Sequence, residues 1–499
     1  MAQLADRPFP PGDYPVVVVG SGPGGLQTSY FLHRRGVRHA LLSADDAPAG
    51  MFRRFPFFQR LISWTKPYAP VERGTRAYER YDWNSLIGEE PEHRTLLPAL
   101  MDGTSYFPSR AEMERGIALF VERTGLQVRH GCRWEATRKD DAGFVVTTTD
   151  GEYRCRAVVF AMGMTKPWKP DTPGMDNVPH YVETRPPEEY ANKRIVIIGK
   201  RNSGFEIADG LLPRARQILL VSPRPARISV VTHSLAGARA RYLQPYEDYI
   251  LAGGTFVLDA AIDHVERNNA GYRVFASGTT RPGDIVLDAE EVIAATGFST
   301  PLLDLPELGV ATFYQGRLPA QTPFWESASL PGIYFAGSVS QGSIGLKKYG
   351  KTGNSAAVHG FRYNAGVLAN HLAGERFGLS LEKPRLRPDE VVPFLLNEAT
   401  EGPDLYNQPS YLAHVVSFDR GAGILDEGIL PLAHFVDSSG PDAVAIAMET
   451  DDEGDTHPAV YVRRGERVDE HLLSSEPMLD FRTAEHKNQL TGVLQSFLT

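Results

Sequence analysis

The stretch Pro15–Ser43 constrains the fold more than any other part of this sequence. It reads PVVVVGSGPGGLQTSYFLHRRGVRHALLS, in which four valines form a short apolar strand and a helical pattern follows a glycine-rich turn. Gly20, Gly22 and Gly25 stand in GxGxxG spacing, and His39–Leu42 begins a second strand. A strand, a glycine turn, a helix and a strand within about 30 residues are typical of a dinucleotide-binding unit. The alternative is an ordinary buried strand–helix turn.

The glycines of this turn predict where the diphosphate of a cofactor lies. The first permits the tight turn, the second lets the pyrophosphate approach the backbone, and the third lets helix and strand pack closely. The phosphate charge then meets the free N–H groups and the positive dipole end of the helix. Ser43 stands where an acidic residue normally binds the ribose hydroxyls. Because serine carries no charge, we expect a weaker hold on the adenosine, unless Asp45 or Asp46 takes that role.

The composition of the 499-residue chain is that of a globular protein with two or three domains, with 42% hydrophobic and 23% charged residues. Its net charge of −9 argues against a nucleic-acid partner. The two cysteines, Cys132 and Cys155, form no CxxC pair, so no redox dithiol is indicated. The sequence shows neither a signal-peptide pattern nor an apolar stretch long enough to span a bilayer, which favours a cytoplasmic enzyme without a membrane partner.

A long loop and several short elements follow the first unit. The loop, Gly50–Leu86, is dense in aromatic residues and arginines, and it is either a packed surface loop or part of the reaction site. A helix is predicted over Ala111–Thr124 with Ser109 as its N-cap. Strands are predicted over Gln127–His130, Phe144–Thr149 and Arg156–Ala161. The first two would form a hairpin that turns at Asp140–Gly143, and the proline-rich segment Lys166–Pro173 is expected to be a linker.

A second unit of the same kind begins at Lys193. Apolar strands are predicted over Ile195–Ile198 and Ile218–Val221, and the turn between them reads GKRNSG. Arg201 occupies the middle glycine position of this turn. A Cβ and a long side chain there hinder the approach of a phosphate, although arginine can itself pair with phosphate.

Two further arginines indicate which nucleotide the second unit takes. Arg224 and Arg227 follow its second strand, where the 2′-phosphate of NADP would lie, and no acidic residue competes there. The pattern therefore favours NADP over NAD. The alternative is that these arginines form a solvated face.

The rest of the chain completes the predicted architecture. Further strands are expected over Thr255–Leu258, Tyr272–Ala276, Glu291–Gly297 and Gly332–Gly337, the last two returning the chain to the first sheet. A helix is expected over Asn354–Leu372. The region after about residue 381 has a helix, Val391–Ala399, and strands Ala443–Met448 and Ala459–Arg463 around the acidic loop Glu449–Asp455. That loop lacks EF-hand spacing and is predicted to be a solvated hairpin tip.

Two nucleotide units, one inserted in the other, resemble the two-dinucleotide-binding flavoproteins. The second turn, with Glu206 and Ala208 after Gly204, is similar to that of class B flavin monooxygenases, and Pro108-Ser109 and His180 also fit that group. A closer resemblance, to the FAD-dependent oxidoreductase domain-containing proteins of the endoplasmic reticulum and their bacterial relatives, spans nearly the whole chain. It rests on Arg60-Leu61-Ile62-Ser63, Asp82-Trp83-Asn84-Ser85-Leu86, Thr232-His233, His359-Gly360-Phe361-Arg362-Tyr363, and Asn397-Glu398-Ala399 with Leu405-Tyr406. Ser43, Arg201 and the missing signal peptide and retention tail depart from it.

The resemblance implies an α/β fold with two Rossmann-like dinucleotide-binding domains and a C-terminal α+β extension. The FAD-binding domain would comprise residues 1–165 and 290–380, the inserted NAD(P)-binding domain residues 166–289, and the extension residues 381–499. The expected FAD contacts are Gly20, Gly22, Pro23, Gly24, Gly25, Ser43, Trp64, Trp83, Arg110 and Gly337. The expected NADP contacts are Gly199, Arg201, Asn202, Ser203, Gly204, Arg224 and Arg227.

The resemblance also implies a reaction. NADPH would reduce FAD, O2 would react at flavin C4a to give a (hydro)peroxyflavin, and one oxygen atom would pass to a nitrogen, sulfur or carbonyl of a small-molecule substrate, in bacterial secondary metabolism. The aromatic loop would exclude water, with Thr65, Lys66 and Asn84 as candidate catalytic residues. Lys347 and Lys348 would face the flavin or solvent.

Two alternatives stay open. One is an NAD(P)H-dependent flavin reductase or oxidase without oxygen insertion, and the other is a flavin-bound adaptor without activity. No metal site and no nucleophile–His–acid set is indicated. A homodimer is among the open oligomeric states.

Overall fold

The computed structural model describes residues 7–58, 60–229, 238–242, 253–302, 305–350, 353–419 and 421–498. They form two compact units. Unit 1 consists of Met1–Arg53, Ser63–Gly163 and Thr300–Thr499, and unit 2 of Arg54–Ile62 and Met164–Ser299. The mixed α/β architecture with parallel sheets confirms the predicted fold class.

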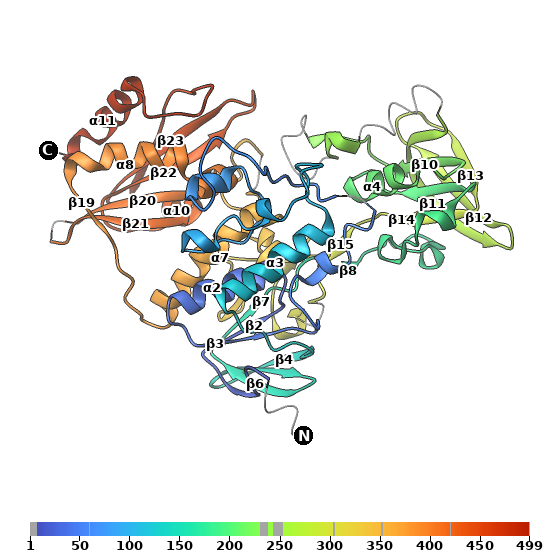
Figure 1. Ribbon diagram of the computed structural model, residues 1–499, viewed down its shortest axis with the longest axis horizontal. Helices are drawn as coiled ribbons and strands as arrows, with labels where there is room; N and C mark the ends of the chain where they lie inside the picture. The colour runs from blue at the N-terminus through green and yellow to red at the C-terminus, as the bar shows by residue number, and fades with distance from the viewer. Residues whose placement is uncertain are drawn as a thin grey trace. The chain divides into compact units, whose positions relative to one another are not determined.

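The first sheet of unit 1 is parallel and has the strand order β18-β7-β2-β3. Its strands are β2 (Val16–Val19), β3 (His39–Leu42), β7 (Ala157–Phe160) and β18 (Ile333–Phe335). Their residues are all buried, as expected for a parallel sheet covered on both faces. Helices α2 (Pro23–Arg34) and α7 (Val358–His371) pack against each other beside this sheet (Figure 1). The unit predicted over Pro15–Ser43 is therefore confirmed.

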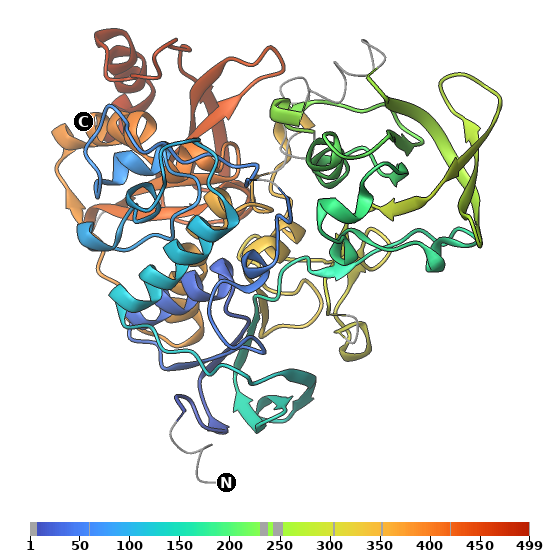
Figure 2. The same cartoon turned by 45° about the vertical axis from the view of Figure 1, so that its right-hand side comes forward.

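A second four-stranded sheet of unit 1 has the order β1-β6-β5-β4; it lies near the N-terminus (Figure 2). Its strands are β1 (Gly12–Asp13), β4 (Trp134–Asp140), β5 (Gly143–Thr148) and β6 (Gly151–Cys155). The predicted hairpin turn at Asp140–Gly143 is confirmed, but the strand predicted over Gln127–His130 is wrong, because only Arg129 makes a bridge, to Leu42. The true partner, β4, has an exposed polar face that hid it in the sequence. Helix α3 (Arg110–Thr124) begins with a Ser109–Glu112 capping box, as its sequence indicates.

Unit 2 is built on one six-stranded sheet with the order β13-β12-β11-β10-β9-β14. Its elements are β9 (Arg194–Ile198), α4 (Asn202–Leu211), β10 (Gln217–Ser222), β11 (Thr255–Asn268), β12 (Gly271–Gly278), β13 (Asp284–Ala289) and β14 (Glu291–Ala294). Strand β14 pairs with β9 in parallel, so the expectation that Glu291–Gly297 rejoins the first sheet is wrong. The unit accordingly continues to Ser299 rather than ending at residue 289, and it also takes Arg54–Ile62 from the aromatic loop.

The C-terminal part of unit 1 is an antiparallel sheet with the order β19-β21-β20-β22-β23-β24. Its elements are β19 (Arg385–Leu386), α8 (Pro388–Glu401), α9 (Pro403–Asn407), β20 (Leu412–Asp419), β21 (Gly423–Pro431), α10 (Leu432–Asp437), β22 (Ala443–Thr450), β23 (Thr456–Arg464), β24 (Arg467–Leu472) and α11 (Ala484–Leu498). Helices α8 and α11 share an apolar core with this sheet (Figure 1). The predicted hairpin tip is confirmed at Asp451–Asp455, where the Asp451 carboxylate accepts three backbone N–H groups of the loop itself. Its predicted start is wrong, because Glu449 is fully buried in β22.

Two short antiparallel pairs complete the strands, β8 (Lys166–Pro167) with β15 (Phe298–Ser299) and β16 (Thr312–Phe313) with β17 (Leu318–Pro319). None of the described helices is long and apolar enough to cross a membrane.

Candidate cofactor site

The first glycine turn has the geometry of a phosphate cradle. Gly20 has a φ of +113°, and a Cβ on it would lie 2.6 Å from the Ala161 carbonyl oxygen. A Cβ on Gly25 would overlap the Gly20 carbonyl oxygen, so the third glycine is required for packing. Gly22 caps α2 in an extended conformation, and a Cβ there would meet nothing within 4 Å. The space in front of the helix is therefore open at the position where a diphosphate is expected.

The start of α2 supplies the attraction for that diphosphate. No side chain caps this helix end, so its orphan N–H groups face the open space, while Pro23 at the first position has none to offer. Gly337 follows β18, separated from it by one alanine, and lies against the same helix start. A Cβ on Gly337 would be 3.3 Å from the Gly24 Cα atom. The structure thus brings Gly20–Gly25 and Gly337 together, and they fit the diphosphate of FAD.

Ser43 lies at the end of β3 beside the turn. Its side chain is buried, its Oγ atom is 2.7 Å from the Ser21 Oγ atom, and it accepts the Asp45 backbone N–H. Of the two alternative acids, Asp46 is exposed and paired with Arg53. The predicted ribose contact of Ser43 stays a prediction.

The second half of the aromatic loop, Ser63–Leu86, is held by a buried polar network. The Thr65 hydroxyl donates to Asp82 Oδ1 at 2.8 Å, and the Asn84 amide donates to Thr65 Oγ1 at 3.0 Å and to the carbonyls of Ser63 and Trp64. The two candidate catalytic residues Thr65 and Asn84 therefore contact each other, and the hydrogen bonds that they make lie within the loop. Their catalytic role stays a prediction.

Asp82 is the loop residue that sequence reasoning missed. It is fully buried, its Oδ1 atom accepts three hydrogen bonds, and its Oδ2 atom has no hydrogen-bond partner among the described residues. A buried carboxylate oxygen without a donor is costly. Asp82 is thus a loop group that a ligand could satisfy. The signal in the sequence was an acid between Tyr81 and Trp83.

The two most specific motifs of the resemblance contact each other. Trp83 packs edge-on against Trp64, with ring centroids 5.3 Å apart, and stacks on His359 at 4.4 Å. From the same motif on α7, the buried Arg362 donates to the carbonyl oxygens of Ser85 and Glu79 at 2.8 and 3.0 Å. The segments DWNSL and HGFRY therefore form one structural element, which explains why they occur together.

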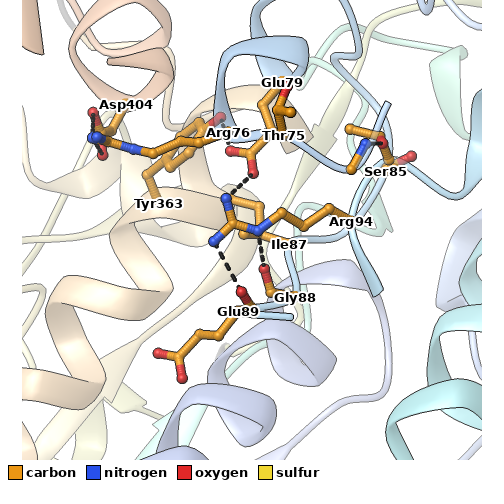
Figure 3. Close-up of polar contacts among 12 residues, drawn as sticks. Thr75, Arg76, Glu79, Ser85, Ile87, Gly88, Glu89, Arg94, Tyr363 and Asp404 are labelled. Carbon is orange, nitrogen blue, oxygen red and sulfur yellow. Dashed lines mark hydrogen bonds and ion pairs between the residues drawn. The ribbon is translucent and has the colours of Figure 1, made fainter. Parts of the chain in front are cut away.

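Glu79 lies at the centre of this element (Figure 3). Its carboxylate accepts the Tyr363 hydroxyl at 2.9 Å and pairs with Arg94 at 3.6 Å, and burial raises the pKa of the Glu79 carboxyl above its usual range. Arg94 also donates to the Gly88 and Glu89 carbonyl oxygens, so it braces the end of the loop (Figure 3).

The remaining predicted residues of unit 1 have mixed outcomes. Lys66 is half-buried and its Nζ atom lies 5.8 Å from the Tyr81 ring centroid, with no ion-pair partner among the described residues. Arg110 is the first residue of α3. Lys347 is exposed, whereas Lys348 binds Glu449 and the Tyr461 hydroxyl of the C-terminal sheet, so both expectations for Lys348 are wrong.

The second glycine turn repeats the backbone of the first. Gly199 has a φ of +128°, and a Cβ on Gly204 would overlap the Gly199 carbonyl oxygen. Arg201 caps α4 with φ −111° and ψ −167°, an extended conformation open to any residue. The backbone at Arg201 thus does not require glycine, and the predicted effect of its exposed side chain on a phosphate stays a prediction.

Exposed arginines occur in this second turn and after the strand that follows its helix. Arg224 and Arg227 follow β10, and neither they nor Arg201 has an ion-pair partner among the residues that the structure describes. Asn202 begins α4 and its Oδ1 atom accepts the Arg239 backbone N–H at 3.0 Å, with Ser203 next to it on the helix. Thr232 and His233 lie outside the described residues.

Lys200 of this turn binds residues of β11. The Lys200 Nζ atom is buried, donates to the Leu258 carbonyl oxygen at 2.6 Å and pairs with Asp259, while burial lowers the pKa of its ammonium group. Lys200 therefore binds the first half of β11 and is not available to a nucleotide.

The first half of the aromatic loop packs within unit 2. Buried Glu206 on α4 accepts the Phe57 and Phe58 backbone N–H groups and the Tyr181 hydroxyl at 2.8 Å, and burial raises its pKa. His180 Nε2 donates to the Gly297 carbonyl oxygen at 2.9 Å. The segment Phe55–Phe58 is thus tied to the second turn's helix. Across the described chain, no group of three or more His, Cys, Asp or Glu side chains could hold a metal ion.

Known proteins share this architecture. The FAD-dependent oxidoreductase domain-containing protein 2 of Danio rerio is 24% identical over 452 residues, which cover 80% of this chain and 64% of that protein. An ornithine N-hydroxylase structure from Kutzneria sp., with FAD, NADP+ and L-ornithine, matches with a TM-score of 0.55 and 15% identity over 73% of this chain and 100% of that one. A bacillithiol disulfide reductase from Staphylococcus aureus matches with a TM-score of 0.55 and 16% identity over 73% of this chain and 99% of that one.

These likenesses confirm the resemblance to flavin-dependent oxidoreductases and monooxygenases, and at this identity the two structures show the fold alone. The model of the pyridine nucleotide-disulphide oxidoreductases matches residues 17–337, more than half of the chain, which confirms the predicted class of oxidoreductase. The chain belongs to the pyridine nucleotide-disulphide oxidoreductase family.

Proposed function

We propose that this chain is an FAD- and NADPH-dependent monooxygenase that inserts one oxygen atom from O2 into a nucleophilic nitrogen or sulfur of a small-molecule substrate. The cytoplasm and the tailoring of a secondary metabolite are the setting that we propose with it. Gly20–Gly25 and Gly337 would hold the FAD diphosphate, and Arg201, Arg224 and Arg227 the phosphates of NADPH. Bound FAD would supply two-electron chemistry and reactivity toward O2.

One observation separates this proposal from disulfide reduction, which the family name also allows. Cys132 and Cys155 are both free and buried in the core of unit 1. Burial raises the pKa of the Cys132 thiol and raises that of Cys155 to about 12. Neither thiol would be a thiolate at neutral pH, so neither suits thiol–disulfide exchange. Two nucleotide turns without a reactive dithiol leave O2 as the electron acceptor that we favour.

The aromatic loop supports the choice of oxygen insertion over peroxide release. Its Trp64 and Trp83 rings pack together, Trp83 stacks on His359 of α7, and the polar groups of the loop bind one another in the buried network of Thr65, Asp82 and Asn84. A loop of this kind would keep water from a reactive centre.

The test uses the purified protein with NADPH, oxygen and a panel of amines and thioethers. We expect a yellow protein, oxygen uptake that matches NADPH oxidation, and an oxygenated product with little hydrogen peroxide. Peroxide in place of product would turn the assignment to an oxidase, and a colourless protein that takes up no added FAD would overturn it altogether. Arg224→Met/Arg227→Met should raise the KM for NADPH about 10-fold and leave the KM for NADH unchanged, because only NADPH carries the 2′-phosphate.

A further inference from the structure

The C-terminal part of the chain has no motif that indicates chemistry. Two residues of the motifs that carry the family resemblance, Glu398 and Tyr406, nevertheless contact the aromatic loop. Arg76 begins the 3₁₀ turn Arg76–Arg80 in that loop. Its guanidinium donates to both carboxylate oxygens of Glu398 on α8, at 2.7 Å each, and to the Asp404 carboxylate on α9 at 3.0 Å (Figure 3). One arginine of the loop therefore joins two helices of the C-terminal part.

The acids that accept hydrogen bonds from Arg76 belong to a buried network in which positive and negative side chains alternate. The side chains of Glu398 and Asp404 are only 6% and 10% exposed. Glu398 also lies 3.0 Å from His414 Nδ1, and His414 Nε2 lies 2.7 Å from Asp426. Although burial opposes both charges, these partners lower the pKa of Glu398 to about 2 and raise that of His414 to about 9. The network stays charged at neutral pH and connects the loop to β20 and β21.

A second arginine of the same turn makes a parallel attachment. Arg80 donates to the Thr400 carbonyl oxygen at the end of α8, and its guanidinium lies 4.4 Å from the Tyr406 ring centroid on α9. Two residues one turn apart thus contact the same two helices. Such doubled contact fixes the orientation of the turn as well as its distance.

The other side of the turn leads to the first glycine turn. Glu79 and its neighbours bind Arg362 and Tyr363, and Arg362 holds the Ser85 carbonyl oxygen. Two residues further on, Ile87 exchanges two hydrogen bonds with Gln27 of α2, at 2.8 and 2.7 Å. A continuous set of directed contacts therefore runs from the C-terminal helices, through the segment Arg76–Ile87, to the helix whose start forms the cradle.

We propose that Arg76 is a positioning residue through which the C-terminal part of the chain fixes the segment Arg76–Ile87 beside α2, so that this part of the chain is a component of the FAD site. The functional half of this statement rests on the proposed function; the structural half does not. Arg76 touches no reacting atom in this scheme and acts through Trp83 and its neighbours.

The experiment compares Arg76→Met with Arg73→Met in the full-length protein. Arg73 is an exposed loop arginine three residues away that has no ion-pair partner among the described residues, so it is a matched control. Hydrogen exchange of the peptide that covers residues 76–87 is measured in the protein without added cofactor. We expect exchange at least tenfold faster in Arg76→Met and unchanged in Arg73→Met, with partial rescue in Arg76→Lys.

A second measurement addresses function, and a second variant keeps the test valid if Arg76→Met does not fold. In the FAD-loaded protein, Arg76→Met should weaken FAD binding several-fold and raise the hydrogen peroxide released per NADPH, with little change in the KM for NADPH. The triple variant Arg76→Met/Glu398→Gln/Asp404→Asn removes the charge on both sides of the contact and should give the same two changes in a stably folded protein.

Each outcome decides one claim. Unchanged exchange in a folded Arg76→Met protein would refute the positioning role. Faster exchange with unchanged FAD binding and peroxide release would refute the link to the FAD site. A wild-type protein that binds no FAD would refute the proposed function, while the exchange comparison would still test the positioning role.

Discussion

The two glycine turns have similar backbones but differ in the residue at the middle position, which is Gly22 in one and Arg201 in the other. In both, the first glycine has a φ in the left-handed region, +113° for Gly20 and +128° for Gly199. Each of these glycines donates its N–H to the end of the next strand, to Leu42 at 2.8 Å and to Val221 at 2.9 Å. Gly22 and Arg201 then cap their helices in similar extended conformations.

The comparison separates what the fold needs from what the ligand needs. The first glycine is required by its φ and the third by the carbonyl oxygen against which it packs, in both turns. Neither requirement applies to the middle residue, because its φ is ordinary and a Cβ on Gly22 would point into open space. Glycine or arginine at the middle position therefore reports on the ligand of each turn and leaves the fold unaffected.

The largest effect is expected at the third glycine, where the two turns should behave alike. Gly25→Ala and Gly204→Ala each place a Cβ on a backbone carbonyl oxygen that cannot move without breaking its sheet. Both variants should lose about 3 kcal/mol or more of unfolding free energy. Denaturant unfolding followed by circular dichroism measures this loss. If one variant kept wild-type stability, the two turns would not share this packing.

The next effect separates binding from folding at the middle position of the first turn. Gly22→Val should fold normally, because nothing lies within 4 Å of the added Cβ. It should nevertheless bind FAD about 100-fold more weakly, a loss of about 2.7 kcal/mol, because its side chain fills the phosphate space. Equilibrium titration with FAD checks this, with Gly492→Val, an open helical position in α11, as the control. Equal FAD affinity of the two variants would contradict the cradle.

A smaller effect concerns the residue after the first glycine, which is Ser21 in one turn and Lys200 in the other. Asp259→Asn leaves the buried Lys200 ammonium without its carboxylate and should cost about 2 kcal/mol of unfolding free energy at neutral pH. Burial favours a higher Asp259 pKa, but the bond from Lys200 outweighs it and lowers that pKa below 3.8. An acid whose pKa is lowered by folding stabilises the folded state at pH values above its ordinary pKa. This stabilisation is lost as the pH falls through the pKa of the folded state.

The stability difference between wild type and Asp259→Asn should therefore be full at pH 6 and shrink progressively below pH 3.8. Ser43→Ala, which removes the neutral hydroxyl contact of the first turn, should show a difference from wild type that does not change over this range. Urea unfolding at several pH values measures both. A pH-independent cost for Asp259→Asn would argue against the ion pair.

The smallest effect is expected at Arg201. Because its backbone is extended and its side chain exposed, Arg201→Gly should change the unfolding free energy by less than about 0.5 kcal/mol. If the guanidinium pairs with a phosphate, the KM for NADPH should rise about fivefold, which corresponds to about 1 kcal/mol. Steady-state kinetics at fixed oxygen checks this. A lower KM would instead show that arginine obstructs the turn.

Local pattern was sufficient to predict both strand–turn–helix units, because each needs only neighbouring residues with the right φ and the right spacing. It was insufficient for β14, since an apolar run ending in small residues looks the same whichever parallel sheet it joins. It also missed β4, whose exposed face carries charged side chains.

The site shows the same division. All glycines of the cradle were among the expected FAD contacts, and all except Gly337 follow each other closely in the chain. The contacts of Arg362 with Ser85 and of Arg76 with Glu398 join residues 277 and 322 positions apart. The motifs include Arg362, Ser85 and Glu398 but not Arg76, and nothing in their spacing showed that these residues touch. Only the fold supplies that information.

The position of Gly337 against Gly24 has a consequence for biosynthesis. The two glycines are separated by more than three hundred residues, including the whole of the inserted unit, so the ribosome must make all of these before the helix start gains its neighbour. Domains generally fold as units during synthesis. The inserted unit is thus complete before the nucleotide-binding edge of its host, and cofactor loading becomes a late event in the life of the nascent chain.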